Sequence, residues 1–361
     1  MVFLLFLLTS FFQASTALPS LQPEFLVVLD TGVGHRSTRI PRWPTSLRSL
    51  TTRGTNATIL TRFGVDSNAN QASEPIGAYA LTYSSLTSSL FSATGQGVIR
   101  TSVAGGDVET ILNDEEDRYG QTISMTVAEK ERKIYYGNSY TGLIRKANFD
   151  GSNNSLVRNV SRGLDYSIPS YATAISYAGG IAVDEERGWL YWSSVRGDDD
   201  GSIRRVPLHG LGGEQVLANG INTPGQLRIV NDSLFWAQGG RQSNSPTAIK
   251  YLDRHLSQLP TSSSLNTPIP TGTLISSSQS PLFFENDSTG EKQTLGITSF
   301  AVYRNEGEQK VWFVVNSAGR TVFGKLVEVV WRGSGDGRGP VFEVLNEDTE
   351  SVGVPVGLEY V

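Results

Sequence analysis

Side chains that could serve metal or nucleophilic chemistry are scarce in this chain. It has no cysteine, and its three histidines, His35, His209 and His255, are widely separated. A metal site needs several such ligands close together. The acidic run Asp198–Asp200 lacks the spaced acceptors and the distal glutamate of an EF-hand loop. No Gly-x-Ser-x-Gly elbow is present, so the sequence predicts no metal, no activated nucleophile and no cofactor.

Net charge and composition narrow the range of partners. The chain has 30 Lys and Arg against 35 Asp and Glu, a net charge of -5. No basic stripe interrupts its strand pattern, so neither nucleic acid nor a membrane is expected as a partner. Glycine-rich stretches around Gly95 and Gly210 fall in predicted turns, which argues against a nucleotide site. Hydrophobic residues at 38% with 38 glycines suit many short strands joined by tight turns.

One stretch, from Gly180 to Val206, shows the structural unit that must position any site. Ile181 to Val183 predicts a short apolar strand, and Glu185 to Gly188 predicts a charged turn. Trp189 to Trp192 predicts an aromatic strand. After a loop of Gly and Asp, Ser202 to Val206 predicts a third strand. A unit like this cannot bury both faces of its sheet alone, so we expect it to recur.

The same order of elements recurs along the chain. Further copies run from Ile123 to Phe149, from Gln226 to Leu252 and, more weakly, from Tyr79 to Val103 and from Thr298 to Leu326. In the last of these, Val322-Phe323 is the expected third strand. With the first stretch, these copies make five units.

The two ends of the chain supply a sixth unit. Phe25 to Asp30, followed by Arg39-Ile40, suggests second and third strands with no first strand before them. Val354 to Val361 suggests a first strand with nothing after it. Joining them closes a ring and leaves no open sheet edge. The predicted fold is therefore all-β, a six-bladed β-propeller whose closing blade is shared between the N- and C-terminal strands.

The aromatic strands carry a family resemblance. Leu190-Tyr191-Trp192-Ser193 and Ile134-Tyr135-Tyr136-Gly137, each followed by an Ile-Arg, resemble the repeats of YWTD propellers, the LDL-receptor class B type. The family tetrapeptide is nowhere intact, because its Asp is replaced by Ser194, Asn138 or Gln238. The resemblance implies the propeller fold, and receptor-type ligand binding does not follow from it.

The N-terminus and the sequons predict secretion. Met1 to Phe12 is an apolar run, and Ser15-Thr16-Ala17 offers small residues for cleavage. We expect a signal peptide over residues 1–17, a single propeller domain over residues 18–361, and a secreted or secretory-lumen protein. No later segment approaches the ~20 apolar residues that span a bilayer. The expected glycosylation sites are Asn56, Asn153, Asn159, Asn231 and Asn286.

Three insertions hold the length that a six-bladed ring does not need. They run from Arg42 to Pro75, from Ser161 to Gly179 and from His255 to Leu295. The first includes the outer strand of the closing blade, and the third is either a lid or a flexible surface loop. Loops between second and third strands are expected on the same face as the connections between blades. They would surround the channel mouth with Arg, Asn, Ser and Tyr, a default position for a ligand site.

A second resemblance suggests a reaction. A secreted, cysteine-free, single propeller of this size is similar to a small fungal group that includes the hetero-Diels-Alderases of tropolone-sesquiterpenoid biosynthesis. The resemblance implies addition of a tropolone ortho-quinone methide to a humulene-type macrocycle, with apolar and tropolone-like small molecules as partners and no cofactor. Arginine donors would bind the tropolone oxygens and aromatic side chains would cover the terpene. The candidate donors are Arg36, Arg241 and Arg320, and the candidate wall residues are Tyr140, Tyr171 and Tyr177.

Two other functions stay open at this point. One is a non-catalytic secreted propeller that binds a protein or a glycan on its loop face. The other is a hydrolase of the lactonase type, which would require bound calcium and would lose its activity when a chelator is added.

Overall fold

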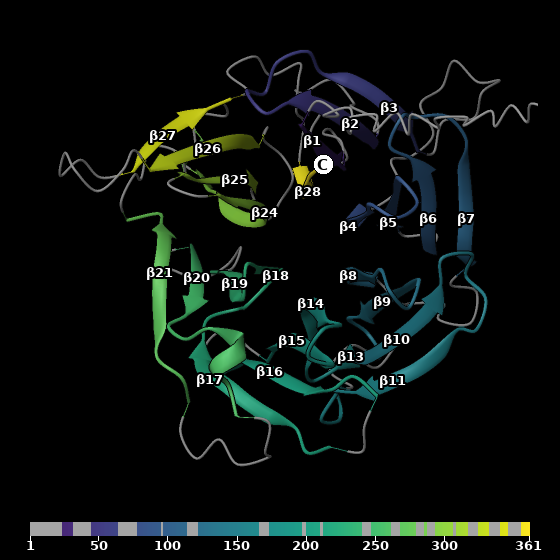
Figure 1. The fold of residues 1–361 in the computed structure, drawn as a ribbon, viewed down its shortest axis with the longest axis vertical. Helices are drawn as coiled ribbons and strands as arrows, with labels where there is room; N and C mark the ends of the chain where they lie inside the picture. The colour runs from purple at the N-terminus through teal and green to yellow at the C-terminus, as the bar shows by residue number, and fades with distance from the viewer. Residues whose placement is uncertain are drawn as a thin grey trace, which may run out of the picture.

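The computed structural model describes residues 24–31, 45–63, 78–94, 97–113, 122–165, 173–196, 200–209, 212–239, 247–260, 268–278, 285–286, 293–305, 308–316, 324–331, 340–345 and 355–361. Six four-stranded antiparallel sheets in these ranges surround a central axis as blades (Figure 1). The first strand of each blade lies nearest the axis, and the fourth lies at the rim. The predicted six-bladed propeller is confirmed.

Blade 1 contains both ends of the described chain and consists of β28 (Pro355–Tyr360), β1 (Phe25–Asp30), β2 (Ser46–Thr51) and β3 (Thr58–Arg62). Blade 2 consists of β4 (Ala78–Ser84), β5 (Ser89–Thr94), β6 (Gly97–Ser102) and β7 (Val108–Asn113). Blade 3 consists of β8 (Thr122–Ala128), β9 (Lys133–Asn138), β10 (Leu143–Asn148) and β11 (Ser155–Asn159).

Blade 4 consists of β14 (Tyr177–Asp184), β15 (Trp189–Val195), β16 (Gly201–Pro207) and β17 (Gln215–Ile221). Blade 5 consists of β18 (Leu227–Val230), β19 (Ser233–Gln238), β20 (Ala248–Leu252) and β21 (Thr271–Ser276). Blade 6 consists of β24 (Gly296–Asn305), β25 (Glu308–Asn316), β26 (Lys325–Trp331) and β27 (Val341–Val344). Small elements outside the blades are β12 (Leu164–Asp165), β13 (Thr173–Ala174), β22 (Glu285–Asn286), β23 (Gln293–Thr294) and the 3-10 helix η1 (Leu256–Gln258).

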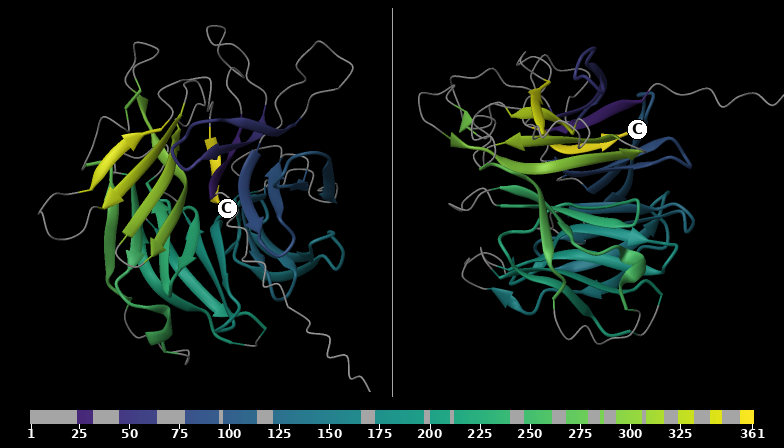
Figure 2. Two further views of the ribbon diagram at one scale, coloured as in Figure 1. Left: turned by 45° about the horizontal axis from the view of Figure 1, so that its top comes forward. Right: turned by 60° about the vertical axis from the view of Figure 1, so that its left-hand side comes forward.

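Hydrophobic packing between blades forms the core. The described residues contain six clusters of buried apolar side chains, and each cluster joins two consecutive blades around the ring. The aromatic residues of the second strands lie at the centre of this packing, and every residue of β15 is buried. Figure 2 shows the sheets side by side around the ring, as this packing requires. The aromatic and β-branched strand residues therefore serve the interfaces between blades.

The closing blade is joined by pairing of the two chain ends. β28 and β1 are antiparallel, with Leu26 opposite Tyr360. Phe25 and Val361 exchange backbone hydrogen bonds of 3.1 and 2.9 Å. This pairing confirms the prediction that the ends of the chain share one blade.

Side chains of the first strands of blades 5 and 6 hold β28 in place. Arg228 of β18 donates to the Leu358 carbonyl at 2.8 Å and to the Glu359 carboxylate at 2.7 Å. Ser299 of β24 accepts the Leu358 N–H at 2.9 Å. Burial raises the pKa of the Glu359 carboxyl, and the adjacent Arg228 guanidinium partly opposes that rise. The C-terminal strand is therefore held by an ion pair that reaches across the inner strand of blade 6.

Close backbone contact between blades 4 and 5 requires a glycine at one inner position. A Cβ atom on Gly180 of β14 would lie 2.3 Å from the Gly225 carbonyl oxygen and 2.6 Å from the Leu227 nitrogen. These neighbours are backbone atoms, which cannot shift to make room for a Cβ atom as the end of a flexible side chain could. Gly180 therefore allows neighbouring inner strands to pack at this distance.

The charged turns between the first and second strands of blades 3 and 4 link consecutive blades. The Glu129 carboxylate of blade 3 accepts the Ser84 hydroxyl at 2.8 Å and the Ser85 N–H at 2.7 Å, both from blade 2. The Glu185 carboxylate of blade 4 accepts the N–H groups of Lys130 and Glu131 of blade 3 at 3.1 and 2.9 Å. The glutamates of these predicted turns thus satisfy backbone donors of the preceding blade.

Substituting Glu185 tests this link between blades. A glutamine keeps the shape but offers one acceptor oxygen for two N–H donors, so Glu185→Gln is expected to cost about 1–2 kcal/mol of unfolding free energy. Urea unfolding followed by fluorescence measures the cost. Glu186→Gln is the matched control, because the Glu186 side chain is 77% exposed, and its change should stay within about 0.5 kcal/mol. Equal effects of the two variants would contradict the link.

Three sequence predictions need correction. Arg39-Ile40 lies outside the described residues, and the third strand of the closing blade is β2 at Ser46–Thr51, which pairs with both β1 and β3. Val322-Phe323 lies outside the described residues, and the third strand of blade 6 is Lys325–Trp331. The insertion from His255 to Leu295 is not only a lid or loop, since it contains η1 and the outer strand β21, where Ile275 is fully buried.

Candidate functional site

The connection from blade 3 to blade 4 contacts a loop within blade 3. The Tyr140 carbonyl in the loop from β9 to β10 accepts the Ala174 N–H at 2.6 Å, and the Gly142 carbonyl accepts the Val160 N–H at 2.8 Å. Residues 160–165 and 173–176 of the connection include the two-stranded pair of β12 and β13. These contacts confirm, for blade 3, the prediction that both kinds of loop reach one face of the ring. We call it the loop face.

Gly142 permits the close approach of these segments. Its φ of +65° lies in the left-handed region, and a Cβ atom there would lie 2.6 Å from the Ser161 Cβ and 2.7 Å from the Ser176 carbonyl oxygen. The Asn138 side chain shapes the same loop by accepting the Tyr140 and Thr141 N–H groups, each at 2.9 Å. Asn138 stands where the YWTD tetrapeptide has Asp, and it caps the loop without a charge.

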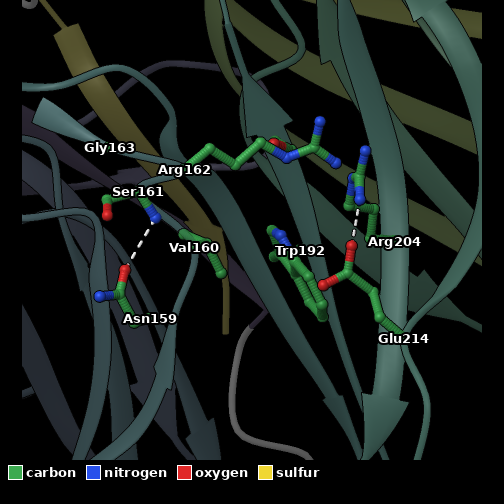
Figure 3. Close-up of a pocket in the computed structure, with 9 residues that line it drawn as sticks. Asn159, Val160, Ser161, Arg162, Gly163, Trp192, Arg204 and Glu214 are labelled. Carbon is green, nitrogen blue, oxygen red and sulfur yellow. Dashed lines mark hydrogen bonds and ion pairs between the residues drawn. The ribbon is translucent and has the colours of Figure 1, made fainter.

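A pocket of about 320 Å³ lies between blades 3 and 4 (Figure 3). Residues 159–163 line one side, and Trp192, Ser194, Arg204 and Glu214 line the other. No inner-strand residue is among these lining residues. The pocket therefore opens between two blades and not at the mouth of the central channel, where the sequence suggests a site. Its volume is at the lower end of the range for small-molecule pockets.

Positive charge dominates the pocket. The Glu214 carboxylate forms ion pairs with Arg204 and, at 3.0 Å, with Arg158. Arg162 is exposed, and within the described part of the chain it has no acidic partner. Figure 3 shows the guanidinium groups of Arg162 and Arg204 extending toward each other above Trp192. The pocket lining therefore contains two guanidinium groups and one carboxylate, so the pocket favours an anion.

Trp192 provides an apolar wall and one unpaired donor. Its side chain is fully buried in the cluster between blades 3 and 4. Its indole N–H lacks an acceptor among the residues that the structure describes. A buried donor without a partner costs about 1–3 kcal/mol.

The backbone around Arg162 has an uncommon conformation. Arg162 has a φ of 49° and the next residue, Gly163, has a φ of 125°. Left-handed conformations are unfavourable for residues other than Gly, Asn and Asp, and they occur often at ligand sites. This turn directs the Arg162 side chain over the pocket (Figure 3).

Most of the predicted ligand residues cannot be placed. Arg36, Arg241, Arg320 and Tyr171 lie outside the described residues. Tyr140 is half-buried in the loop after β9, and Tyr177 is half-buried at the start of β14. Both belong to blades 3 and 4 at the loop face, but neither lines the pocket. Their roles stay predictions.

The predicted glycosylation sites are exposed where the structure describes them. Asn56, Asn153, Asn159 and Asn231 are exposed, while the side chain of Asn286 is not described. Three of the four have positive φ values, 55° for Asn56, 55° for Asn153 and 44° for Asn231. Asparagine tolerates this conformation well, so turn geometry alone accounts for asparagine there. Glycosylation stays a prediction.

Sequence reasoning missed the residues that form the pocket. Trp192 is part of the repeat motif and predicts core packing. Arg204 follows an isoleucine in a third strand, as Arg100 and Arg145 do in two other units. Arg162 lies in the insertion from Ser161 to Gly179, but the residues of that insertion that the sequence suggested as ligand contacts were Tyr171 and Tyr177. No sequence signal indicates that these side chains face each other across two blades.

The described residues contain neither a candidate metal cluster nor a candidate membrane-spanning helix. No group of three or more His, Cys, Asp or Glu side chains in these ranges could hold a metal ion. None of their helices is long and apolar enough to cross a membrane.

No protein-family model matches the chain. A curated relative is "Low-density lipoprotein receptor-related protein 1" of Pyricularia oryzae, 26% identical over 158 residues, which cover 41% of this chain and 50% of that protein. The match thus spans about half the length of the curated relative. This similarity agrees with the YWTD-like repeats.

Solved structures share the fold. A chain of the nidogen/laminin complex matches with a TM-score of 0.57 and 14% identity, over 93% of this chain and 98% of that chain. TolB from Acinetobacter baumannii matches with a TM-score of 0.55 and 12% identity, over 93% of this chain and 66% of that chain. The chain is a six-bladed β-propeller, and part of it is similar to a receptor-related relative.

Proposed function

We propose that this propeller binds a small organic molecule at the interface of blades 3 and 4. The observation that supports this proposal is the pocket of about 320 Å³, in which two arginines lie beside a buried indole. An apolar wall with a few convergent polar groups is the usual composition of a small-molecule site.

The reaction that we propose for this site is a hetero-Diels-Alder cycloaddition without a cofactor. A tropolone ortho-quinone methide would add across one double bond of a humulene-type sesquiterpene. Holding two neutral partners in a reactive geometry lowers a bimolecular barrier by several kcal/mol. Guanidinium donors at the tropolone oxygens would draw electron density from the heterodiene. Arg162 and Arg204 join Arg36, Arg241 and Arg320 as candidate donors.

Product analysis tests this reaction. The purified protein is incubated with a hydroxymethyl tropolone and humulene, and the adducts are resolved by chiral chromatography against a heat-denatured control. One stereoisomer formed well above the background rate is expected. Racemic adduct at the background rate would reject the reaction for this pair of substrates.

A second candidate function is binding of a protein or glycan without catalysis. The Pyricularia oryzae relative is a receptor-related protein by name, which favours this function. A glycan array and immobilised matrix glycoproteins test it directly. Saturable binding that survives Arg162→Ala would support a binding surface separate from the pocket, whereas absence of binding would reject this candidate.

We also propose that the chain enters the secretory pathway. The N-terminal apolar run and the exposed sequon asparagines support this. Expression of the full chain in a yeast, followed by peptide mass spectrometry of the medium, tests the proposal. A mature N-terminus after Ala17 and glycopeptides containing Asn56 or Asn153 are expected. Retention of the uncleaved, unglycosylated chain inside the cells would contradict it.

A further inference from the structure

We infer that the pocket between blades 3 and 4 recognises an anion whose single negative charge is shared by two neighbouring oxygen atoms, with Glu214 as its built-in competitor. Aromatic carboxylates and the tropolonate ion both have this chemistry. The inference deepens the proposed function, because it assigns a chemical class to the ligand of the same pocket. It concerns binding and does not require that any cycloaddition occurs.

The arrangement around Glu214 shows that the pocket already holds a carboxylate. Its two oxygens are divided between two cations, Oε1 with Arg204 and Oε2 with Arg158 at 3.0 Å. The Arg204 side chain is 13% exposed, and its Nε also donates to the Ser202 hydroxyl at 2.7 Å. The Arg204 guanidinium is thus fixed in place. Planar guanidinium groups bind paired oxygens through two parallel hydrogen bonds.

A ligand can replace Glu214 on Arg204 without leaving Glu214 alone. The Glu214 carboxylate would retain its ion pair with Arg158. The ligand would gain Arg204 together with Arg162, which lacks an acidic partner in the described ranges. The exchange conserves the number of ion pairs around Glu214 and Arg204 and adds one to Arg162. The structure therefore permits binding without burying an unpaired charge.

The third contact is the Trp192 indole. Its N–H is buried and lacks an acceptor in the described structure, although the indole lines the pocket. In Figure 3 the indole lies directly below the two guanidinium groups. A flat ring against this wall would place its oxygens toward the arginines. Such a ligand is planar and carries its charge at one edge.

Binding of benzoate and of tropolonate tests the inference. The probes are titrated into the full-length protein at pH 8 and low salt. Calorimetry measures affinity, and the ¹⁵N-labelled indole N–H resonances report contact with Trp192. Saturable binding with a shift of one indole resonance is expected for at least one probe. Benzoate alone would identify a carboxylate ligand, and tropolonate alone a tropolone-type ligand.

Charge variants assign the binding to this pocket. Arg162→Ala removes an exposed side chain and is expected to weaken binding about 10- to 100-fold, as for a lost charge-assisted hydrogen bond. Glu214→Gln removes the competitor and should strengthen binding several-fold. Ser194→Asp adds a negative charge and should abolish binding. Arg196→Ala is the matched control, since Arg196 forms an exposed pair with Asp200 on the same blade and should leave affinity unchanged.

Three results would overturn the inference. The first is no saturable binding of either probe at millimolar concentration. The second is equal affinity of Arg162→Ala and the unchanged protein. The third is weaker binding in Glu214→Gln, with folding verified by thermal melting. A negative cycloaddition assay would reject the proposed reaction and would not contradict the anion site. A negative binding experiment would reject the anion site, and product analysis would still decide whether the reaction occurs.

Discussion

Replacing Arg228 by alanine is expected to lower the free energy of unfolding by about 3–5 kcal/mol, the usual cost of breaking a buried ion pair from one side. The Glu359 side chain is 9% exposed and the Arg228 side chain 21% exposed. Arg228 also donates to the Leu358 carbonyl at 2.8 Å, so its loss removes support from the strand that closes the ring. Calorimetry should show a fall in Tm on the order of 10 °C.

The pH dependence of this defect has a defined sign. The pKa of Glu359 is raised from its ordinary value of 4.5, so the folded chain holds that proton more tightly than the unfolded chain does. Stability from this group is present at low pH and is lost as the pH rises through the raised pKa. Without Arg228 the ionised carboxylate has no nearby cation among the described residues. The Arg228→Ala defect should therefore be larger at pH 8 than at pH 5 in urea unfolding.

A matched substitution controls for removal of an arginine in general. The Arg145 Nε donates to the Asn154 side chain at 3.1 Å in an exposed position. Arg145→Ala should change the unfolding free energy by less than about 0.5 kcal/mol. A defect of the same size in both variants, or a larger Arg228→Ala defect at pH 5, would refute the role given to the ion pair.

Trp236→Ala is expected to cost about 3–5 kcal/mol, the range for removing a large buried aromatic side chain. Trp236 is fully buried between blades 4 and 5. Its indole N–H has no acceptor in the described part of the chain. Trp236→Phe fills most of the space and removes the unpaired donor, so it should cost much less than the alanine variant. Denaturant unfolding gives both values.

The contrast with Trp312 makes this prediction specific. Trp312 is buried between blades 6 and 1, and its indole N–H donates to the Thr52 carbonyl at 3.1 Å. Trp312→Phe therefore loses a hydrogen bond that Trp236→Phe does not lose. We expect the Trp312→Phe variant to be less stable than Trp236→Phe by about 0.5–1.5 kcal/mol. The reverse order would show that packing, and not the donor, decides these costs.

The predictable part of the fold is the part that repeats. Strands such as β9 and β15 combine aromatic residues with a charged turn before them, and weaker copies of this unit predict the other blades. The half-units at the two chain ends predict the shared sixth blade. The sequence predicts least where a mostly polar strand follows a long loop. β2, with the sequence Ser-Leu-Arg-Ser-Leu-Thr, carries no aromatic residue. Pairing with β1 and β3, and not its own composition, makes it a strand.

The candidate site was predictable only in its outline. The insertion from Ser161 to Gly179 was expected to matter, and Arg162 lies within it. The sequence also showed that Ser194 replaces the Asp of the YWTD tetrapeptide. Ser194 lines the pocket, so the replacement leaves the pocket without a second carboxylate. This effect on the pocket could not be predicted from the sequence, because the pocket forms only where blade 3 packs beside blade 4.

Two neighbouring arginines show where sequence information ends. The sequence alone determined that Arg204 and Arg205 lie in a third strand, where side chains alternate between faces. Tertiary structure decided their environments. Arg205 is 1% exposed, lies 4.0 Å above the Trp189 ring and donates to the Pro260 carbonyl. Arg204 faces the pocket. Strand periodicity separates the two side chains, but only the packing of blades determines which side is solid core and which is open.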